Sequence, residues 1–222
     1  SNTVHLVMVD ARRGGHPTPM SDTKSTMKLV EYLDDDNDLS KKGIDKLTGY
    51  VAEAKGLVEQ MRCEEMISFA TSAVRDANNS DDVLDHVEKE TGIRLEILSG
   101  EDEARLTFLA VRRWYGWSAG RIINLDIGGG SLELTSGTDE DPEAAYSLLL
   151  GAGRLTHEWF DTDPPSRKKI DLLRDYIDAE LVEPARHLRT LGEPDLAVAT
   201  SKSFRTLARL TGAAPCSAGP RV

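Results

Sequence analysis

Residues 125–134 read LDIGGGSLEL. An apolar residue and an aspartate lead to three glycines and a serine, and a segment of alternating apolar and polar residues follows, which carries a glutamate. A Walker A phosphate loop needs a Lys and then a Ser or Thr after its last glycine, and neither is in place here. A dinucleotide-binding fingerprint needs a helix after the glycines and a third Gly or Ala where Glu133 stands, and an alternating strand follows instead. The stretch therefore predicts a strand, a tight turn and a second strand.

The chemistry of this hairpin points to phosphate and a metal. Glycines allow close backbone approach to a ligand and can aim several N–H groups at one spot, although an ordinary glycine-rich hairpin turn fits the loop as well. Carboxylates beside such a loop are the oxygen ligands that Mg²⁺ takes together with phosphates and waters. We therefore expect phosphate binding at Gly128, Gly129, Gly130 and Ser131, and Mg²⁺, or alternatively Mn²⁺, at Asp126 and Glu133.

On either side of the hairpin, apolar runs alternate with helical periodicity, which is typical of an α/β fold. Apolar residues three to four positions apart predict a long helix over 41–62. Ser80 is expected to cap a second helix and Ser99 a third, with Asp102 completing a capping box. Strands are expected at 4–11, 66–74, 93–98, 121–127, 131–137, within 143–156 and at 194–201, and a further long helix over 165–188.

The break YGWSAG at 115–120 separates two halves of the pattern, and we expect the domain boundary there. The expected domains are residues 1–116 and residues 117–222.

Composition excludes several classes of protein. The 222 residues include no run near the ~20 apolar residues that a membrane span requires, and we read no signal peptide at the start. A formal net charge of −11 opposes nonspecific binding to nucleic acid or anionic lipid. Only Cys63 and Cys216 are present, which is unlike a disulfide framework. We therefore expect a cytoplasmic protein with no nucleic-acid or membrane partner.

Four segments in this order resemble one family: SNTVHL (1–6), ATSAVRDA (70–77), LSGEDEARLTFLAV (98–111) and LDIGGGSLEL. The resemblance is to the Ppx/GppA family of exopolyphosphatases and guanosine pentaphosphate phosphohydrolases, specifically its short two-domain branch, and it covers essentially the whole chain. It implies the actin, Hsp70 and sugar-kinase superfold, with two ribonuclease-H-like lobes around a cleft, and it implies a homodimer.

The resemblance also implies residue roles. Glu103 corresponds to a catalytic base that acts on water, and Arg75 to an arginine that grips phosphate. Lys202, in TSKSF (200–204), is a candidate phosphate contact. The metal would lie at Asp126 and Glu133, and phosphate would also meet Ser1, Asn2 and Thr3, the remnant of the family's first phosphate motif.

Each of these roles has an ordinary structural alternative. Glu103 can be a carboxylate that simply favours a helix N-terminus. Arg75 can be a strand-end arginine that pairs with Asp76 or Asp81. Lys202 can be a solvated lysine at a helix start.

The chain also departs from the family pattern. The first phosphate motif reads strand, Asp, any residue, Gly, Ser, Asn, then Ser or Thr, and this chain starts at the Ser. We expect the first strand with its metal-binding aspartate to be missing, together with the later part of the second lobe. The loss of a metal ligand and a central strand predicts that the 222-residue chain is weakly active or inactive by itself.

The leading expectation is a hydrolase that removes the terminal phosphate of inorganic polyphosphate by metal-assisted attack of water. Such an attack needs orientation more than strong chemistry, and a carboxylate aimed at the site supplies it. One alternative is hydrolysis of the 5′-terminal phosphate of guanosine pentaphosphate. Another is a module of the same superfold that binds phosphate or nucleotide without turnover, and a kinase is a weaker possibility.

Overall fold

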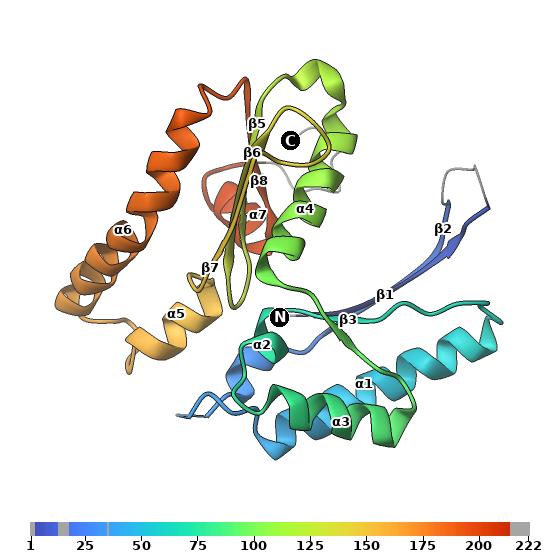
Figure 1. Ribbon diagram of the computed structural model, residues 1–222. Coiled ribbons are helices and arrows are strands. Elements are labelled where there is room, and N and C mark those ends of the chain that lie inside the picture. The colour runs from blue at the N-terminus through green and yellow to red at the C-terminus, as the bar shows by residue number, and fades with distance from the viewer. Residues whose placement is uncertain (1–2, 13–17, 35, 214–222) are drawn as a thin grey trace. The chain divides into compact units, whose positions relative to one another are not determined.

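The computed structural model describes residues 3–12, 18–34 and 36–213, which divide into two compact units, Ser1–Leu98 and Ser99–Val222. Both units are built from helices and strands, as expected for an α/β chain (Figure 1). The predicted phosphate contacts Ser1 and Asn2, and also Cys216, lie outside the described residues. No helix among the described residues is both long and apolar enough to cross a membrane.

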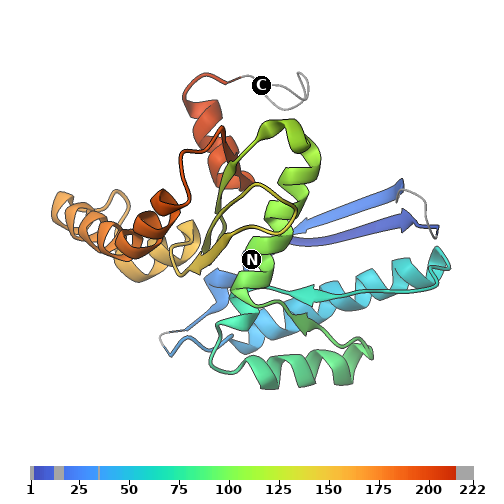
Figure 2. The ribbon, with the colours of Figure 1, turned by 45° about the horizontal axis from the view of Figure 1, so that its top comes forward.

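In the first unit, a core of buried aliphatic side chains joins one long helix to a hairpin and a second helix. Val51, Val83 and Val87 are among its most buried members. Helices α1 and α3 lie side by side in both ribbon views (Figures 1 and 2). The elements are β1 (Thr3–Asp10), β2 (Thr18–Thr26), η1 (Leu29–Tyr32), α1 (Lys41–Gln60), β3 (Phe69–Ala70), α2 (Ser72–Arg75), α3 (Ser80–Thr91) and β4 (Glu96–Ile97).

Three expectations for this unit need correction. The strand expected over 66–74 is only two residues long, because the chain turns into the short helix α2, where the N–H groups of Val74 and Arg75 both donate to the carbonyl of Thr71. The strand expected over 93–98 pairs only at Glu96–Ile97. Helix α3 starts at Ser80, so Asn79 takes the N-cap position, and the Asn79 side chain bonds the backbone of Leu39 instead of capping.

The second unit is a four-stranded sheet with helices on both faces. Its elements are α4 (Gly100–Tyr115), η2 (Trp117–Ala119), β5 (Ile122–Ile127), β6 (Leu132–Gly137), β7 (Ala144–Leu148), α5 (Ala152–Trp159), α6 (Arg167–Thr190), β8 (Leu196–Thr200) and α7 (Ser201–Leu210). The strand order is β7-β6-β5-β8; β8 runs parallel to β5, and the other pairs are antiparallel. Figure 1 shows α4 on one side of the sheet and α6 on the other.

Helix α4 packs on the sheet of the second unit through Phe108 and Val111, which meet Ile122 and Val198. The compact units therefore divide between Leu98 and Ser99, whereas the break in the sequence pattern suggested a division after residue 116. This packing brings the first turn of α4 and the glycine hairpin into one unit.

Period-two alternation separates two faces of the sheet. Leu134 and Leu132 belong to the apolar cluster that α5 and α6 cover. Glu133, which lies between them, and the residues that alternate with the leucines point to the opposite face, toward α4. On that face the strands carry a row of polar side chains at the end nearest the glycines: Asn124, Asp126, Glu133, Thr135, Ser147 and Thr200.

Candidate functional site

The glycine hairpin places two carboxylates opposite each other, as the sequence predicted. Asp126 near the end of β5 pairs with Glu133 in β6, and the next pair, Ile127 with Leu132, closes the ladder. Residues paired directly across an antiparallel ladder share one face, with Cβ atoms roughly 5 Å apart. Both carboxylates therefore lie on the α4 face at the mouth of the loop.

In the glycine loop, Gly128–Ser131, all three glycine carbonyls accept hydrogen bonds from one neighbouring segment. The carbonyl of Gly128 accepts from Ala152 N at 3.0 Å, that of Gly129 from Arg154 N at 2.9 Å, and that of Gly130 from Arg154 Nε at 3.1 Å. In a planar trans peptide the N–H points away from its carbonyl. The N–H groups of residues 129–131 therefore face the other way, and within the described part of the chain none of the three has an acceptor. Successive unbonded N–H groups of this kind suit an anion such as phosphate.

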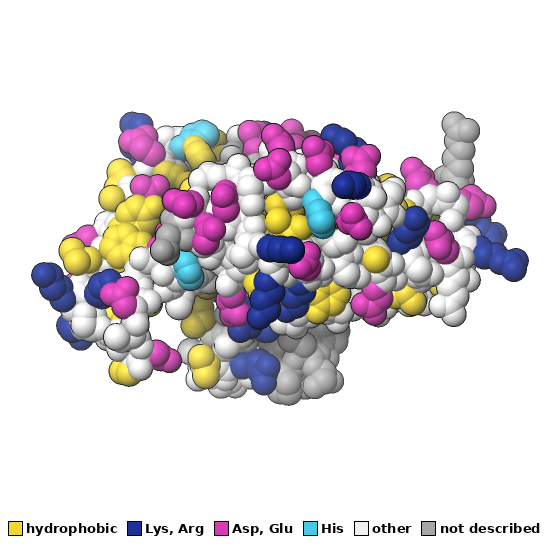
Figure 3. Space-filling model, turned by 90° about the horizontal axis from the view of Figure 1, so that it is seen from below, with side chains coloured by type: hydrophobic (Ala, Val, Ile, Leu, Met, Phe, Trp, Pro, Cys, Tyr) yellow, Lys and Arg dark blue, Asp and Glu magenta, His cyan; other side chains and the backbone are white. Residues whose placement is uncertain are grey.

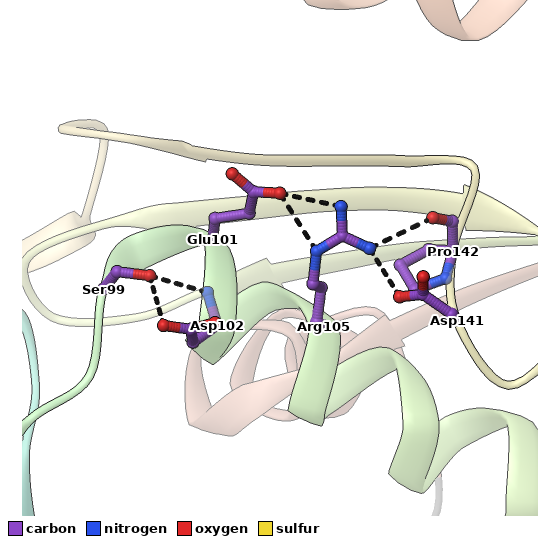
Figure 4. Close-up of polar contacts among 6 residues, drawn as sticks. All are labelled: Ser99, Glu101, Asp102, Arg105, Asp141 and Pro142. Atoms are coloured by element: carbon purple, nitrogen blue, oxygen red, sulfur yellow. Dashed lines mark hydrogen bonds and ion pairs between the residues drawn. The ribbon is translucent and has the colours of Figure 1, made fainter.

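The first turn of α4 is anchored by the neighbours of Glu103. The Ser99 side chain accepts from Asp102 N at 3.0 Å and donates to the Asp102 carboxylate at 2.6 Å, which confirms the predicted cap (Figure 4). Arg105 donates to Glu101 at 2.7 Å and also contacts Asp141 (Figure 4). Glu101 and Asp102 therefore stabilise the helix start.

Glu103 has a different environment, because it interacts with the polar face of the sheet. Burial, together with the negative charges of Glu103 and Asp126, raises the pKa of Glu133 to about 7, although hydrogen bonds from Ser131 and Ser147 act in the opposite direction. The Ser147 hydroxyl lies 3.0 Å from Oε1 of Glu133. The second unit therefore brings together Glu103, Asp126 and Glu133, which we call the carboxylate cluster.

The donor set fits the expected magnesium ion in part. Asp126 and Glu133 offer hard oxygens, and a cation between them would relieve the repulsion that raises the pKa of Glu133. Among the described residues, no three His, Cys, Asp or Glu side chains converge closely enough to hold a metal alone. A metal here would depend on phosphate and water oxygens for its remaining ligands, as Mg²⁺ commonly does.

The corner between β8 and α7 supports Asp126 from the side. The Thr200 hydroxyl donates to Oδ2 of Asp126 at 2.6 Å, and the Ser201 hydroxyl donates to the carbonyl of Ile127 at 2.8 Å. Ser201 has a φ of 84°, an uncommon conformation for a residue with a side chain. Lys202 follows as an exposed residue in the first turn of α7, and its role stays a prediction.

The remaining predicted residues lie in the first unit. Arg75 closes α2, where its guanidinium bonds the Asp76 carboxylate at 2.9 Å and the carbonyl of Leu98 at 3.1 Å. The alternative expected for Arg75, pairing with Asp76, is thus present, and phosphate binding stays a prediction. Thr3 begins β1 opposite Thr26.

Sequence reasoning missed Arg154 and Thr200. The segment GAGR at 151–154 was interpreted as a simple glycine turn, but it begins helix α5 and contacts the glycine loop directly. Two glycines in alternate positions before an arginine were the available signal. The segment TSKSF pointed to Lys202, and the role of Thr200 was missed because the parallel pairing of β8 with β5 brings it to Asp126.

Comparison with known proteins shows the family of the chain. The model of the Ppx/GppA phosphatase family matches residues 8–219. Exopolyphosphatase 1 of Mycobacterium tuberculosis is 64% identical over 222 residues, which are 100% of this chain and 64% of that protein. Exopolyphosphatase 1 of Mycobacterium leprae is 62% identical over 221 residues, covering 100% of this chain and 65% of that protein. The chain thus spans just under two thirds of the length of these curated relatives.

Solved structures show the same fold. The Ppx/GppA family member of Aquifex aeolicus matches with a TM-score of 0.69 and 25% identity, over 95% of this chain and 66% of that one. An exopolyphosphatase from Cytophaga hutchinsonii matches with a TM-score of 0.85 and 24% identity, over 98% of this chain and 70% of that one. The expected superfold is therefore confirmed, and the chain belongs to the Ppx/GppA phosphatase family.

Proposed function

We propose that the protein is a metal-dependent exopolyphosphatase, which removes the terminal phosphate of inorganic polyphosphate by attack of water. The observation that carries this proposal is the position of the glycine loop beside the carboxylate cluster. Three unbonded N–H groups suit a phosphate, and the carboxylates beside them suit a cation and a water. The names of the mycobacterial relatives support the substrate class.

Each group has a distinct task in this proposal. The loop N–H groups at 129–131 hold the terminal phosphoryl group and stabilise its charge. Glu103, on a helix start that Ser99 fixes, accepts a proton from the attacking water and orients it. Because the transferred group is loosely bonded in the transition state, correct orientation contributes more than a strong base does.

Asp126 and Glu133 would hold Mg²⁺, with Mn²⁺ as an alternative. The ion would neutralise part of the negative charge of the phosphate groups. Thr200 orients Asp126 through the 2.6 Å hydrogen bond, and Ser147 orients Glu133. On the face shown in Figure 3, acidic side chains are spread widely, so a polyanionic substrate needs a local site of this kind.

The test measures phosphate release from short and long polyphosphate and from guanosine pentaphosphate at equal concentration, with Mg²⁺ and with a chelator. We compare the 222-residue chain with a polypeptide that covers the full length of the relatives. Release from polyphosphate that needs Mg²⁺ supports the proposal. Faster release from guanosine pentaphosphate would replace the substrate, and tight binding of phosphate compounds without release by the full-length polypeptide would indicate a binding module.

Two further parts of the proposal concern the whole protein. We propose that it acts in the cytoplasm, since Cys63 is a free thiol in the structure. We also propose that it forms a homodimer, which light scattering of the full-length polypeptide tests directly.

A further inference from the structure

One short segment supports the glycine loop from behind. This segment, Gly151–Arg154, is called the GAGR turn here. It supplies the three donors that occupy the carbonyls of Gly128, Gly129 and Gly130. Because these contacts fix the direction of each peptide plane, they also fix the direction of the N–H groups on its other side.

The GAGR turn lies so close to the loop that side chains are excluded from it. A Cβ atom on Gly151 would lie 2.3 Å from the carbonyl carbon of Gly130 and 2.4 Å from the nitrogen of Ser131. A Cβ atom on Gly153 would lie 3.1 Å from the carbonyl oxygen of Gly129. Backbone contact therefore requires glycine at position 151, whereas a side chain at position 153 would be tight and would need the loop to shift by a few tenths of an ångström.

Arg154 contacts the loop through its side chain as well as its backbone. Its side chain is only 8% exposed, and its Nε donates to Gly130 while Nη1 meets Glu158 at 3.3 Å, one turn later in α5. A nearly buried guanidinium that bonds a backbone carbonyl is costly to place and strongly oriented. Its use here is not explained by packing alone.

We propose that Arg154 is a positioning residue for phosphate binding: it holds the peptide between Gly130 and Ser131 so that the loop N–H groups face the bound phosphate. This inference rests on the proposed function for its consequence in catalysis. The geometric part, that Arg154 orders the loop, stands independently and is measured without substrate.

The first experiment measures amide hydrogen exchange in the full-length polypeptide without ligand. Arg154→Met removes the bond to Gly130, so exchange at the Gly128 amide, which donates to the carbonyl of Ser131 within the loop at 2.8 Å, should rise about tenfold while the amides of β5 keep their protection. Arg154→Lys keeps a donor and should restore part of the protection. The matched control is Arg186→Met on α6, where the exposed Arg186 pairs with Glu183 at 2.6 Å, and this control should leave the loop unchanged.

The second experiment measures calorimetric binding of imidodiphosphate, a hydrolysis-resistant phosphate compound, with Mg²⁺ present. Arg154→Met should weaken binding at least about tenfold, and phosphate-release assays should show the loss mainly as a higher KM, because the loop holds the ground state as well. Gly151→Ala, which displaces the same peptide, should have the same effect.

The outcomes separate the two proposals. Unchanged loop exchange in Arg154→Met, or a rise that extends equally through β5, would overturn the positioning role whatever the enzyme does. Increased loop exchange without weaker imidodiphosphate binding would overturn the link to phosphate. If the unsubstituted protein binds no imidodiphosphate, the proposed function fails, and the exchange result still decides whether Arg154 orders the loop.

Discussion

The two faces of the sheet in the second unit are formed by the same strands, yet they differ in chemistry. One face is a closed apolar cluster with α5 and α6, which includes Leu132 and Leu134. The other is apolar where Phe108 and Val111 meet Ile122 and Val198, and it becomes polar toward the glycine loop. The apolar face serves stability, and the polar face is where we propose ligand binding, because buried polar groups reduce stability unless they are fully bonded.

Three consecutive residues of β6 show the difference between the apolar face and the polar face. Glu133, Leu134 and Thr135 are 3%, 5% and 0% exposed, so burial does not distinguish them. Leu134 packs in the apolar cluster, whereas Glu133 has a raised pKa and Thr135 Oγ1 has no partner within the described part of the structure. Substitutions at these positions, together with Glu103 above them, test the comparison.

Leu134→Ala should show the largest effect. Removing a buried leucine from the apolar cluster should lower the free energy of unfolding by about 3–4 kcal/mol. Urea denaturation followed by circular dichroism measures the change. The control is Leu172→Ala on α6, where the leucine is 48% exposed and the loss should be below about 0.5 kcal/mol. Equal losses at both positions would contradict the assignment of the apolar face.

Glu103→Gln tests the polar face by activity instead of stability. In the full-length polypeptide, phosphate release should fall at least ~10²-fold, which corresponds to about 2.7 kcal/mol of transition-state stabilisation, with little change in thermal unfolding. Glu101→Gln in the same helical turn is the control, because Glu101 pairs with Arg105, and activity should stay within about threefold. Unchanged turnover in Glu103→Gln would refute its role as base.

Glu133→Gln should stabilise the chain in a pH-dependent way. The pKa of Glu133 in the folded protein is raised to about 7 from 4.5, so its stabilising contribution is complete below about pH 4.5 and is lost as the pH rises through 7. Glutamine does not titrate. In the presence of a chelator, the variant should therefore match the parent near pH 4.5 and exceed it by about 3 kcal/mol near pH 8.5.

Thermal unfolding across this pH range measures the difference. Mg²⁺ should reduce it at high pH, because the cation stabilises only the ionised glutamate. A gap that persists at pH 4.5 would mean that ionisation of Glu133 is not its cause.

Thr135→Val should have the smallest effect. Valine keeps the shape of threonine and removes a buried hydroxyl that has no partner among the described residues. The free energy of unfolding should stay constant or rise by up to about 1 kcal/mol. A loss above about 1 kcal/mol in urea denaturation would show that the hydroxyl is bonded, for example to an internal water, and would weaken the contrast with Leu134.

Local sequence signals predicted much of the second unit. The hairpin around the glycines was predicted correctly because period-two alternation and consecutive glycines act over a few residues. The cap at Ser99 was predicted for the same reason, since it joins residues three apart. The sequence placed Asp126 and Glu133 beside the loop, and the register of the folded hairpin pairs them directly.

Local signals failed where distant segments decide the structure. The apolar run at 66–74 suggested a strand, but only Phe69 and Ala70 pair, and the chain then turns into α2. Helix α5 was missed because its glycines indicate a turn, while its first residues are held by hydrogen bonds to the glycine loop. The packing of α4 on the second sheet was likewise not readable from the break at 115–120.

The sequence by itself determined the family, the α/β class, and the identity of the carboxylates and glycines, because these depend on residue type and short spacing. Only the tertiary structure decided that the charge of Glu103 raises the pKa of Glu133, that Thr200 orients Asp126, and that the GAGR turn donates hydrogen bonds to the glycine carbonyls. Each of these contacts joins segments about 20 or more residues apart. Their geometry depends on the packing of strands and helices, which no local pattern specifies.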